Sequence, residues 1–390
     1  MYVNELKQYI DNMIFSKMKN YKDLSNETGV PESTISKWLT HGSEISAFSF
    51  TKIICALHPD DKCIQEQLTI QYLQSLKEGS SLNPKILFLI SYLNRNMKVF
   101  HHLIEKCSCH KYKSVRKYAE IFQLYRLRLE GGNIKKLYLE IDPIRKGITK
   151  KERDVEVLCD ILSMIILLDL GEIKLVEIYR KKIKKNFNKM GKSFLKVIYR
   201  FWVDELFSYY LLRKNEVEKF RRYYNILRFQ KDLKFFPIIQ SSLDLKAGES
   251  HLLSNEYNKA VMLLESSLQI FEKWGDHSRY KQALNDIYFL RIKEWKDIDK
   301  LDFKTMHLAE LAFYYIKLEE YEKANILLDE LEGNYGYLTA VQTCYRGMAK
   351  FDTDLIRKSI EMFKNNNDYF FVKFAEQMYG EYVEKSKIML

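Results

Sequence analysis

Residues that turn or break a helix are scarce in this chain. It holds only 5 prolines and 14 glycines among 390 residues, and its apolar residues do not alternate as they do in half-buried strands. Sandwiches and barrels, which need many turns, are therefore excluded. Leu, Ile, Lys, Glu and Tyr instead fill long runs with helical spacing. We expect an all-α protein, and 46% hydrophobic residues suffice for a substantial core.

The sequence also lacks the patterns of membrane, secreted and metal-dependent proteins. Its most apolar run, residues 161–168, is too short to cross a bilayer. The six cysteines are scattered and no signal peptide is visible, which favours a reducing cytoplasm. Cys107 and Cys109 point about 200° apart on a helix, so packed thiols are a better interpretation than a zinc site. Catalytic and phosphate-binding motifs are missing, and we expect neither a cofactor nor enzymatic activity.

Residues 20–39 have the spacing of a helix-turn-helix, the unit that places one helix in the major groove of DNA. Gly29 suits the left-handed turn between the two helices. Ile35, Trp38 and Leu39 share the predicted inward face of the second helix. An ordinary helical hairpin is the alternative, because glycine joins many amphipathic helices. If the unit reads DNA, the outward side chains are the binding residues, namely Glu32, Ser33, Thr34, Ser36 and Lys37.

The net charge of +11 is unevenly distributed. Residues 1–60 hold 6 lysines and 7 acidic residues, whereas residues 101–230 hold 30 basic and 16 acidic residues. The helix-turn-helix is therefore slightly acidic and the middle of the chain strongly basic. A positive surface there would contact phosphates and make DNA binding salt-dependent. A solvated, lysine-rich helix face explains the same residues equally well.

The remaining sequence predicts helical repeats. We place a boundary near residue 65, between a helix-turn-helix domain (1–65) and a repeat region (66–390). Residues 248–264 and 312–328 share one pattern at an offset of 64 residues, and 347–363 repeat it more weakly. A small residue followed by an aromatic residue and alanine is typical of tetratricopeptide-type repeats, whose concave face suits an extended peptide. Chance similarity among leucine-rich helices is the alternative.

Together the two parts resemble the peptide-responsive regulators of Gram-positive bacteria, and more narrowly the arbitrium receptors (AimR) of temperate phages. Four segments carry this resemblance, at residues 225–230, 253–257, 281–284 and 364–370. It implies a cytoplasmic homodimer that binds operator DNA and controls the decision between lysis and lysogeny. A secreted peptide of about six residues would bind the repeat groove and stop activation.

The resemblance also assigns ligand-binding residues. Arg228 and Asp368 match an arginine and an aspartate with which the family holds its peptide. For each, a plain surface ion pair is the alternative. Four further residues near the predicted groove are candidates, namely Asn285, Asp286, Tyr288 and Phe370.

Two rival functions fit much of the same sequence. One is a host or plasmid quorum-sensing regulator of the same architecture, which the genes beside it would distinguish. The other is a peptide-regulated interaction or phosphatase-type repeat protein. Members of that class lack the helix-turn-helix pattern of residues 20–39.

Overall fold

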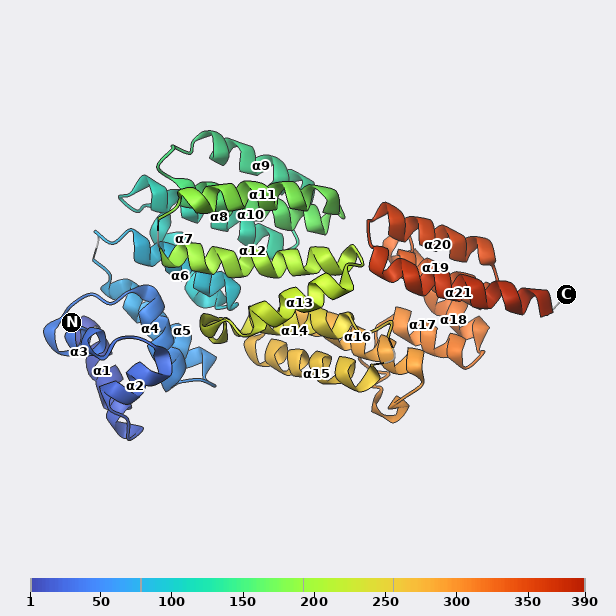
Figure 1. Cartoon of the computed structure of the whole chain (residues 1–390), viewed down its shortest axis with the longest axis horizontal. Helices are drawn as coiled ribbons and strands as arrows, with labels where there is room; N and C mark the ends of the chain where they lie inside the picture. The colour runs from blue at the N-terminus through green and yellow to red at the C-terminus, as the bar shows by residue number, and fades with distance from the viewer. Residues whose placement is uncertain (1, 78, 192, 255, 389–390) are drawn as a thin grey trace. The chain divides into compact units, whose positions relative to one another are not determined.

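The computed structural model describes residues 2–77, 79–191, 193–254 and 256–388, and every regular element in those ranges is a helix (Figure 1). The all-α prediction is therefore confirmed. Consecutive helices are joined by short loops, as expected for a chain that buries amphipathic helices against their neighbours. None of the helices in the described ranges has the length and apolar character needed to span a membrane.

The chain forms two compact units, each built from three segments. The predicted boundary at residue 65 falls inside the first unit and stays a prediction. The first unit comprises Met1–Ile166, Tyr179–Val203 and Gln230–Ile239, and the second comprises Leu167–Ile178, Asp204–Phe229 and Gln240–Leu390.

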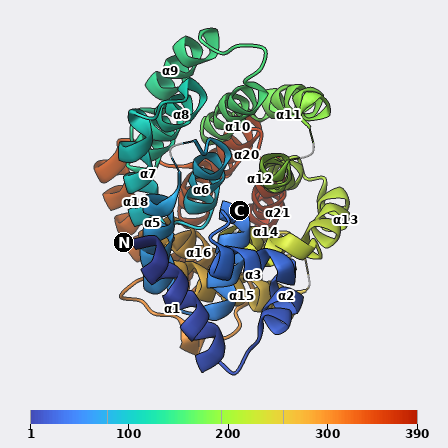
Figure 2. The same ribbon diagram turned by 90° about the vertical axis from the view of Figure 1, so that its left-hand side faces the viewer.

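In the first unit, aromatic rings from three successive helices form the centre of the core. Phe88 stacks on Phe122 with ring centroids 4.9 Å apart, and Phe100 meets Phe122 edge-on at 5.7 Å. Figure 2 shows α1, α2 and α3 in front of the other helices of this unit. Its helices are α1 (Tyr2–Ser16), α2 (Tyr21–Thr28), α3 (Glu32–His41), α4 (Ala47–Leu57), α5 (Lys62–Ser75), α6 (Leu82–Leu93), α7 (Met97–Ser108), α8 (Lys113–Leu129), α9 (Ile134–Lys146), most of α10 (Arg153–Asp169) and η1 (Lys231–Phe235).

The second unit consists mainly of helix pairs. Two long helices, α11 (Ile173–Lys189) and α12 (Phe194–Arg213), contribute residues to both units, as do the end of α10 and the start of α14. The others are α13 (Val217–Arg228), α14 (Pro237–Glu249), α15 (Tyr257–Trp274), α16 (His277–Glu294), η2 (Ile298–Lys300), α17 (Leu308–Lys317), α18 (Tyr321–Tyr335), α19 (Ala340–Lys350), α20 (Thr353–Asn365) and α21 (Tyr369–Ile388).

Small residues let the paired helices approach closely, as the repeat pattern predicts. A Cβ atom added to Gly248 would lie 2.7 Å from the Leu264 side chain. At Gly347 it would lie 2.6 Å from Ile356 Cγ1 and 2.9 Å from the Asp352 carbonyl oxygen. These glycines are therefore needed for packing rather than for a turn. Asn255, which also belongs to the pattern, lies outside the described residues.

Candidate functional site

Local sequence features position the two helices of the predicted helix-turn-helix. The Asn20 side chain caps α2 and forms a capping box with Asp23. Gly29 ends the helix in the left-handed conformation, with φ of 69°, and its N–H donates to the Ser25 carbonyl oxygen at 2.7 Å. Pro31 then precedes α3 with φ of −56°. The predicted turn is therefore present at the predicted residues.

Helix α3 is anchored on one side and polar on the other. Ile35 and Trp38 are 0% and 4% exposed, and Trp38 meets Phe50 edge-on with ring centroids 5.8 Å apart. Leu39 is only half-buried, so it contributes less to the anchor than its position predicts. The five predicted DNA-binding residues all reach the surface: Glu32, Ser33 and Lys37 are exposed, and Thr34 and Ser36 are half-buried.

A second candidate site surrounds α14 in the second unit. Residues 241–250 are all buried, although three of them are charged. Isolated charges in such surroundings are costly, and each of these has an oppositely charged partner on a neighbouring helix. Lys246 forms a buried ion pair with Glu205 of α12. The other two, Asp244 and Glu249, each bind an arginine.

Arg213, at the end of α12, is the centre of this polar cluster. Its Nη2 lies 2.9 Å from Glu249 Oε2, and its Nη1 lies 3.2 Å from Asp368 Oδ2. The guanidinium carbon stands 4.7 Å from the centroid of the Tyr209 ring. Glu249 is 1% exposed and also accepts a hydrogen bond from Gln282 Nε2 at 2.7 Å. Helices α12 and α14 and the residue before α21 thus meet at one guanidinium, and α16 joins them through Gln282.

Asp286, on α16, belongs to the same cluster, and its side chain interacts with that of Glu249. Burial, and then the neighbouring carboxylate of Glu249, raise its pKa well above the usual value, while Arg213 opposes the shift. In the described part of the chain, its solvent-inaccessible Oδ2 has no hydrogen-bond partner. Its surroundings therefore favour the protonated form of Asp286, and they lie beside an arginine that pairs with two other carboxylates.

Arg228, the last residue of α13, forms a separate ion pair with Asp244 of α14. Its Nε donates to Asp244 Oδ1 at 2.9 Å, and the Tyr224 hydroxyl donates to the same oxygen at 2.7 Å. Arg228 is 34% exposed and Asp368 is 20% exposed, so both predicted peptide-binding charges reach solvent. The structure brings Asp368 and Asp286 together around Arg213, whereas Arg228 binds Asp244 instead.

The remaining predicted ligand contacts differ in their accessibility. Asn285 is half-buried on α16. Tyr288 and Phe370 are buried, with the Tyr288 hydroxyl 3.4 Å from Thr305 Oγ1 and the Phe370 ring 5.3 Å from that of Phe371. Both side chains therefore have packing roles in this conformation, and their contact with a ligand stays a prediction.

Sequence reasoning missed the residues that connect this cluster. Arg213 and Glu249 were not predicted, nor was the ion pair of Lys246 with Glu205. A signal was present in α14, because Asp244, Lys246 and Glu249 interrupt an otherwise apolar or small-residue helix. Charges at that spacing cannot share one solvent-facing side of a helix.

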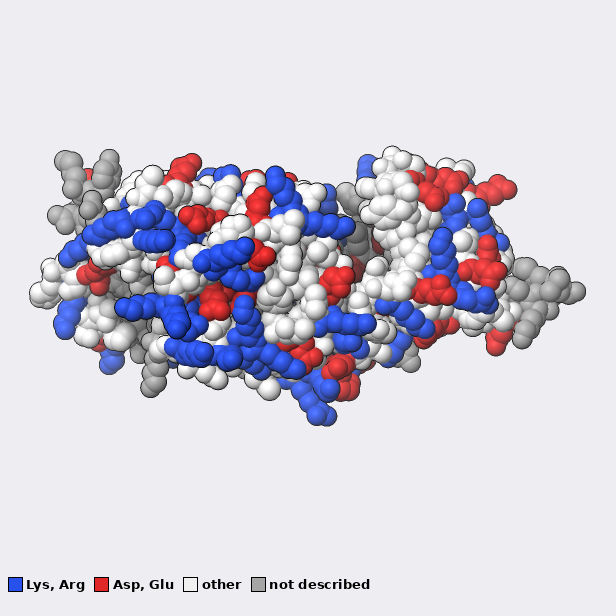
Figure 3. All heavy atoms as spheres, turned by 90° about the horizontal axis from the view of Figure 1, so that it is seen from above, with Lys and Arg blue, Asp and Glu red and all other residues white. Residues whose placement is uncertain are grey.

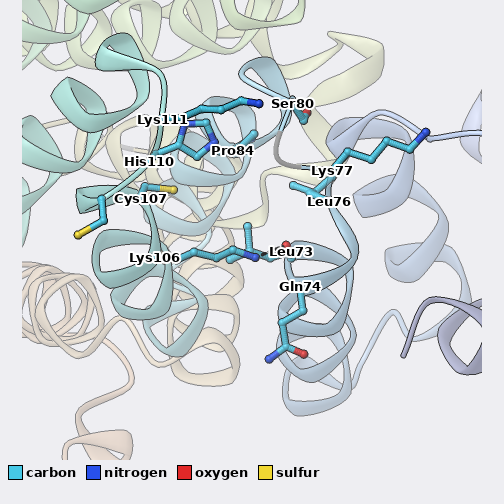
Figure 4. Close-up of a pocket in the computed structure, with 11 residues that line it drawn as sticks. Leu73, Gln74, Leu76, Lys77, Ser80, Pro84, Lys106, Cys107, His110 and Lys111 are labelled. Carbon is cyan, nitrogen blue, oxygen red and sulfur yellow. Dashed lines mark hydrogen bonds between the residues drawn. The ribbon is translucent and has the colours of Figure 1, made fainter. Parts of the chain in front are cut away.

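Cys107, Cys109 and His110 line a cavity of about 480 Å³ in the first unit (Figure 4). Lys106 Nζ donates to the Leu73 carbonyl oxygen at 2.7 Å, and Lys77 points away from the other labelled side chains. Burial raises the pKa of Cys107 to about 12, so its thiol stays protonated and is a poor metal ligand. Among the described residues, His, Cys, Asp and Glu form no group of three able to hold a metal ion.

Some basic residues in the middle of the chain are paired with a buried acidic residue of the same unit. Buried Asp160 on α10 accepts hydrogen bonds from Arg145 Nη2 at 2.9 Å and from Lys182 Nζ at 2.8 Å. The face drawn in Figure 3, where α9 and α11 lie, carries Lys and Arg interspersed with acidic side chains. A role of this face in DNA binding stays a prediction.

A turn that joins two short helices, followed by a longer series of paired helices, is an arrangement found in regulators that combine a DNA-binding unit with a repeat region. Residues 65–377 match the AimR transcriptional regulator-like family. The chain belongs to this family of regulators, which is the family that the sequence resemblance identified.

One relative and two solved structures are similar to this chain over most of their own length. An uncharacterized protein of Bacillus anthracis is 27% identical over 248 residues, which cover 63% of this chain and 91% of that protein. The solved structure of selenomethionine phAimR is 19% identical, with a TM-score of 0.73, over 98% of this chain and 97% of that one. A phAimR structure with its ligand is 18% identical, with a TM-score of 0.70, over 88% and 98%. At these identities the two structures establish a shared fold.

Proposed function

We propose that this chain is a DNA-binding transcriptional regulator whose second unit senses a short signalling peptide, as arbitrium receptors do. The observation that carries the proposal is the geometry of α3, a polar helix on a buried anchor, in a member of a transcriptional-regulator family. Because that family is one of regulators, we infer that the protein has no catalytic activity and needs no cofactor. We place it in the cytoplasm of the bacterial host.

In this proposal α3 enters the major groove. Ser33 and Ser36 are short enough to approach base edges, whereas Lys37 suits a backbone phosphate. Two copies of the chain would place two α3 helices on the half-sites of an operator, which is why we propose a homodimer.

The charged cluster around Arg213, together with the separate pair of Arg228 and Asp244, is the proposed peptide-binding site. The phAimR structure solved with its ligand supports a ligand site within this fold. Arg228 and Asp368 reach solvent, so a peptide can contact them before it displaces buried groups. Arg228 is suited to the peptide's carboxylate and Asp368 to a basic group, and charge-assisted bonds of this kind offset the ordering of a flexible ligand.

Asp286 gives the site a response to a cationic ligand. A positive group placed near Asp368 and Asp286 would favour the ionised form of Asp286 and release its proton. Peptide binding would then change the charge at the centre of the helix pairs. To act as a switch, the peptide must bind two conformations of the chain with unequal affinity.

Titrations with labelled DNA test this proposal. The full chain is incubated with fragments that flank its own gene, with and without synthetic peptides from small neighbouring reading frames. We expect binding that the cognate peptide changes in affinity or in oligomeric state. Lys37→Ala should weaken binding to all sequences, and Ser33→Ala or Ser36→Ala should relax sequence preference. Binding unaffected by every peptide would refute the switch, and binding unaffected by all three substitutions would refute α3 as the reader.

A further inference from the structure

A segment from the middle of the chain is fixed against the helix-turn-helix. Residues 230–239 belong to the first unit and include η1. Lys234 Nζ donates to the Glu27 carbonyl oxygen at 2.8 Å, in the last turn of α2. Asp232 Oδ1 forms an ion pair with Lys52 Nζ of α4 at 2.6 Å. A buried aromatic contact adds to these polar ones, since the Phe48 ring centroid lies 6.0 Å from that of Phe236.

Lys231 lies over the turn that leads into α3. A Cβ atom added to Gly29 would stand 3.5 Å from Lys231 Nζ and 3.7 Å from its Cε. The turn is only three residues from Glu32, where α3 begins. Lys231 is exposed, so its ammonium group faces solvent beside the end of the helix that enters the groove in our proposal.

The surface next to Lys231 continues its positive charge. A cavity of about 590 Å³ adjoins it, formed by the start of α12 and the beginning of η1. Its basic members, Lys196, Arg200 and Lys231, have no carboxylate partner among the described residues, whereas its acid, Asp232, is already paired with Lys52. The other residues that line it are Ser193, Phe194, Val197, Phe201 and Gln230.

The helix-turn-helix itself has little charge to offer to DNA. Residues 1–60 hold 6 lysines against 7 acidic residues. Of those lysines, Lys19 is paired with Glu27 and Lys52 with Asp232. Lys37 is the one lysine on α3, and Glu32 on the same helix opposes it. Neutralised phosphates supply most of the non-specific affinity of DNA-binding proteins, so cations outside residues 1–60 would strengthen DNA binding.

We propose that Lys231, with Lys196 and Arg200, binds the phosphate backbone beside the groove that α3 reads. The inference rests on the proposed DNA binding and adds a contact surface that lies outside the helix-turn-helix in sequence. The major groove is about 12 Å wide and is bordered by phosphates, so a cation beside the N-terminal end of α3 lies close to one strand. These residues hold the duplex without contributing sequence preference.

The salt dependence of DNA binding tests this surface. The probe is a labelled duplex that the wild-type full chain selects from a random pool, titrated between 50 and 200 mM NaCl. Each lost phosphate contact lowers the slope of log K against log salt by about 0.9. We expect Lys231→Ala to lose about 0.9 and Lys196→Ala/Arg200→Ala about twice that, with an unchanged selected sequence. Lys231→Arg keeps the charge and should keep the slope.

The control is Lys358→Ala, which removes an exposed lysine from α20 of the second unit and should leave the slope unchanged. If Lys37→Ala weakens binding while Lys231→Ala and the double variant keep the wild-type slope, the surface is refuted and DNA binding by α3 stands. If the wild-type chain selects no duplex, both proposals fall. A change in the selected sequence with Lys231→Ala would also contradict a phosphate contact.

Discussion

The two candidate sites differ in where they place their polar groups, which face solvent in the first unit and lie in the interior in the second. In the helix-turn-helix, Ile35 and Trp38 are buried and the polar side chains of α3 face outward. In the second unit, α14 is buried and its charges point to charges on neighbouring helices. A surface residue is removed at little cost to stability, whereas removal of one partner of a buried pair leaves an unpaired charge. In the function that we propose, DNA reading is therefore separable from folding, whereas peptide sensing is coupled to it.

Substitution of Arg213 should break this comparison most visibly. Arg213→Met leaves Glu249 and Asp368 without their cation, and we expect a loss of about 3–5 kcal/mol in the free energy of unfolding. Lys37→Met on α3 should change it by less than about 0.5 kcal/mol. Urea unfolding followed by circular dichroism measures both.

A second variant covers the case in which the Arg213→Met chain does not fold. Arg213→Lys keeps the charge but loses the fork that reaches two carboxylates, so it should fold with a smaller deficit. Equal unfolding midpoints for the Arg213→Met and Lys37→Met chains would show that the buried cluster contributes no more to stability than a surface lysine does.

Two glycine substitutions compare a packed position with an open position in the helical pairs of the second unit. Alanine at Gly347 would meet Ile356 Cγ1 at 2.6 Å and backbone atoms at 2.9 Å, and such overpacking costs about 1–3 kcal/mol. Gly333, inside α18, has nothing within 4 Å of an added Cβ. Gly333→Ala should therefore stabilise by about 0.5–1 kcal/mol through helix propensity. Thermal unfolding of both variants measures the difference, and a stabilised Gly347→Ala chain would contradict close helix packing there.

The difference between the two sites also explains what could be predicted from sequence. The helix-turn-helix depends on neighbours in the chain: Gly29 must adopt positive φ, and Ile35 and Trp38 fall on one face by helical spacing. These local requirements are visible in a single sequence. The half-buried Leu39 shows their limit, because tertiary contacts decide how deeply a helix face is covered.

The charged cluster depends instead on residues that are far apart in the chain. Arg213 and Asp368 are separated by 155 residues, and no periodicity links them. The family resemblance identified Asp368, and a polar position on a repeat helix identified Asp286. Neither clue pointed to Arg213 or Glu249, which become meaningful only when the helices are packed together. All-helical architecture followed from composition, whereas the pairing of buried charges required the fold.

The pH dependence of stability gives the finest test of the buried site. The pKa of Asp286 is raised in the folded chain, whereas in the unfolded chain the carboxyl group ionises above about pH 3.9. Between that pH and its raised pKa the folded state binds more protons, so the free energy of unfolding falls by up to about 1.4 kcal/mol per pH unit. Asparagine at this position cannot ionise, so the Asp286→Asn chain should lack this contribution to the change of unfolding free energy with pH.

The comparison is made between pH 5 and 8, as the difference in unfolding midpoint between wild type and variant. We expect Asp286→Asn to gain stability relative to wild type as the pH rises. Exposed Asp302 provides the control, because hydrogen bonds from Thr305 and the Lys304 backbone lower the pKa of its carboxyl group. Its stabilising effect is lost only as the pH falls through that lowered pKa. The difference in unfolding midpoint between the Asp302→Asn chain and wild type should therefore stay constant between pH 5 and 8. Parallel curves for Asp286→Asn and wild type would mean that Asp286 is ionised in the folded chain and that the cluster carries one more negative charge than we describe.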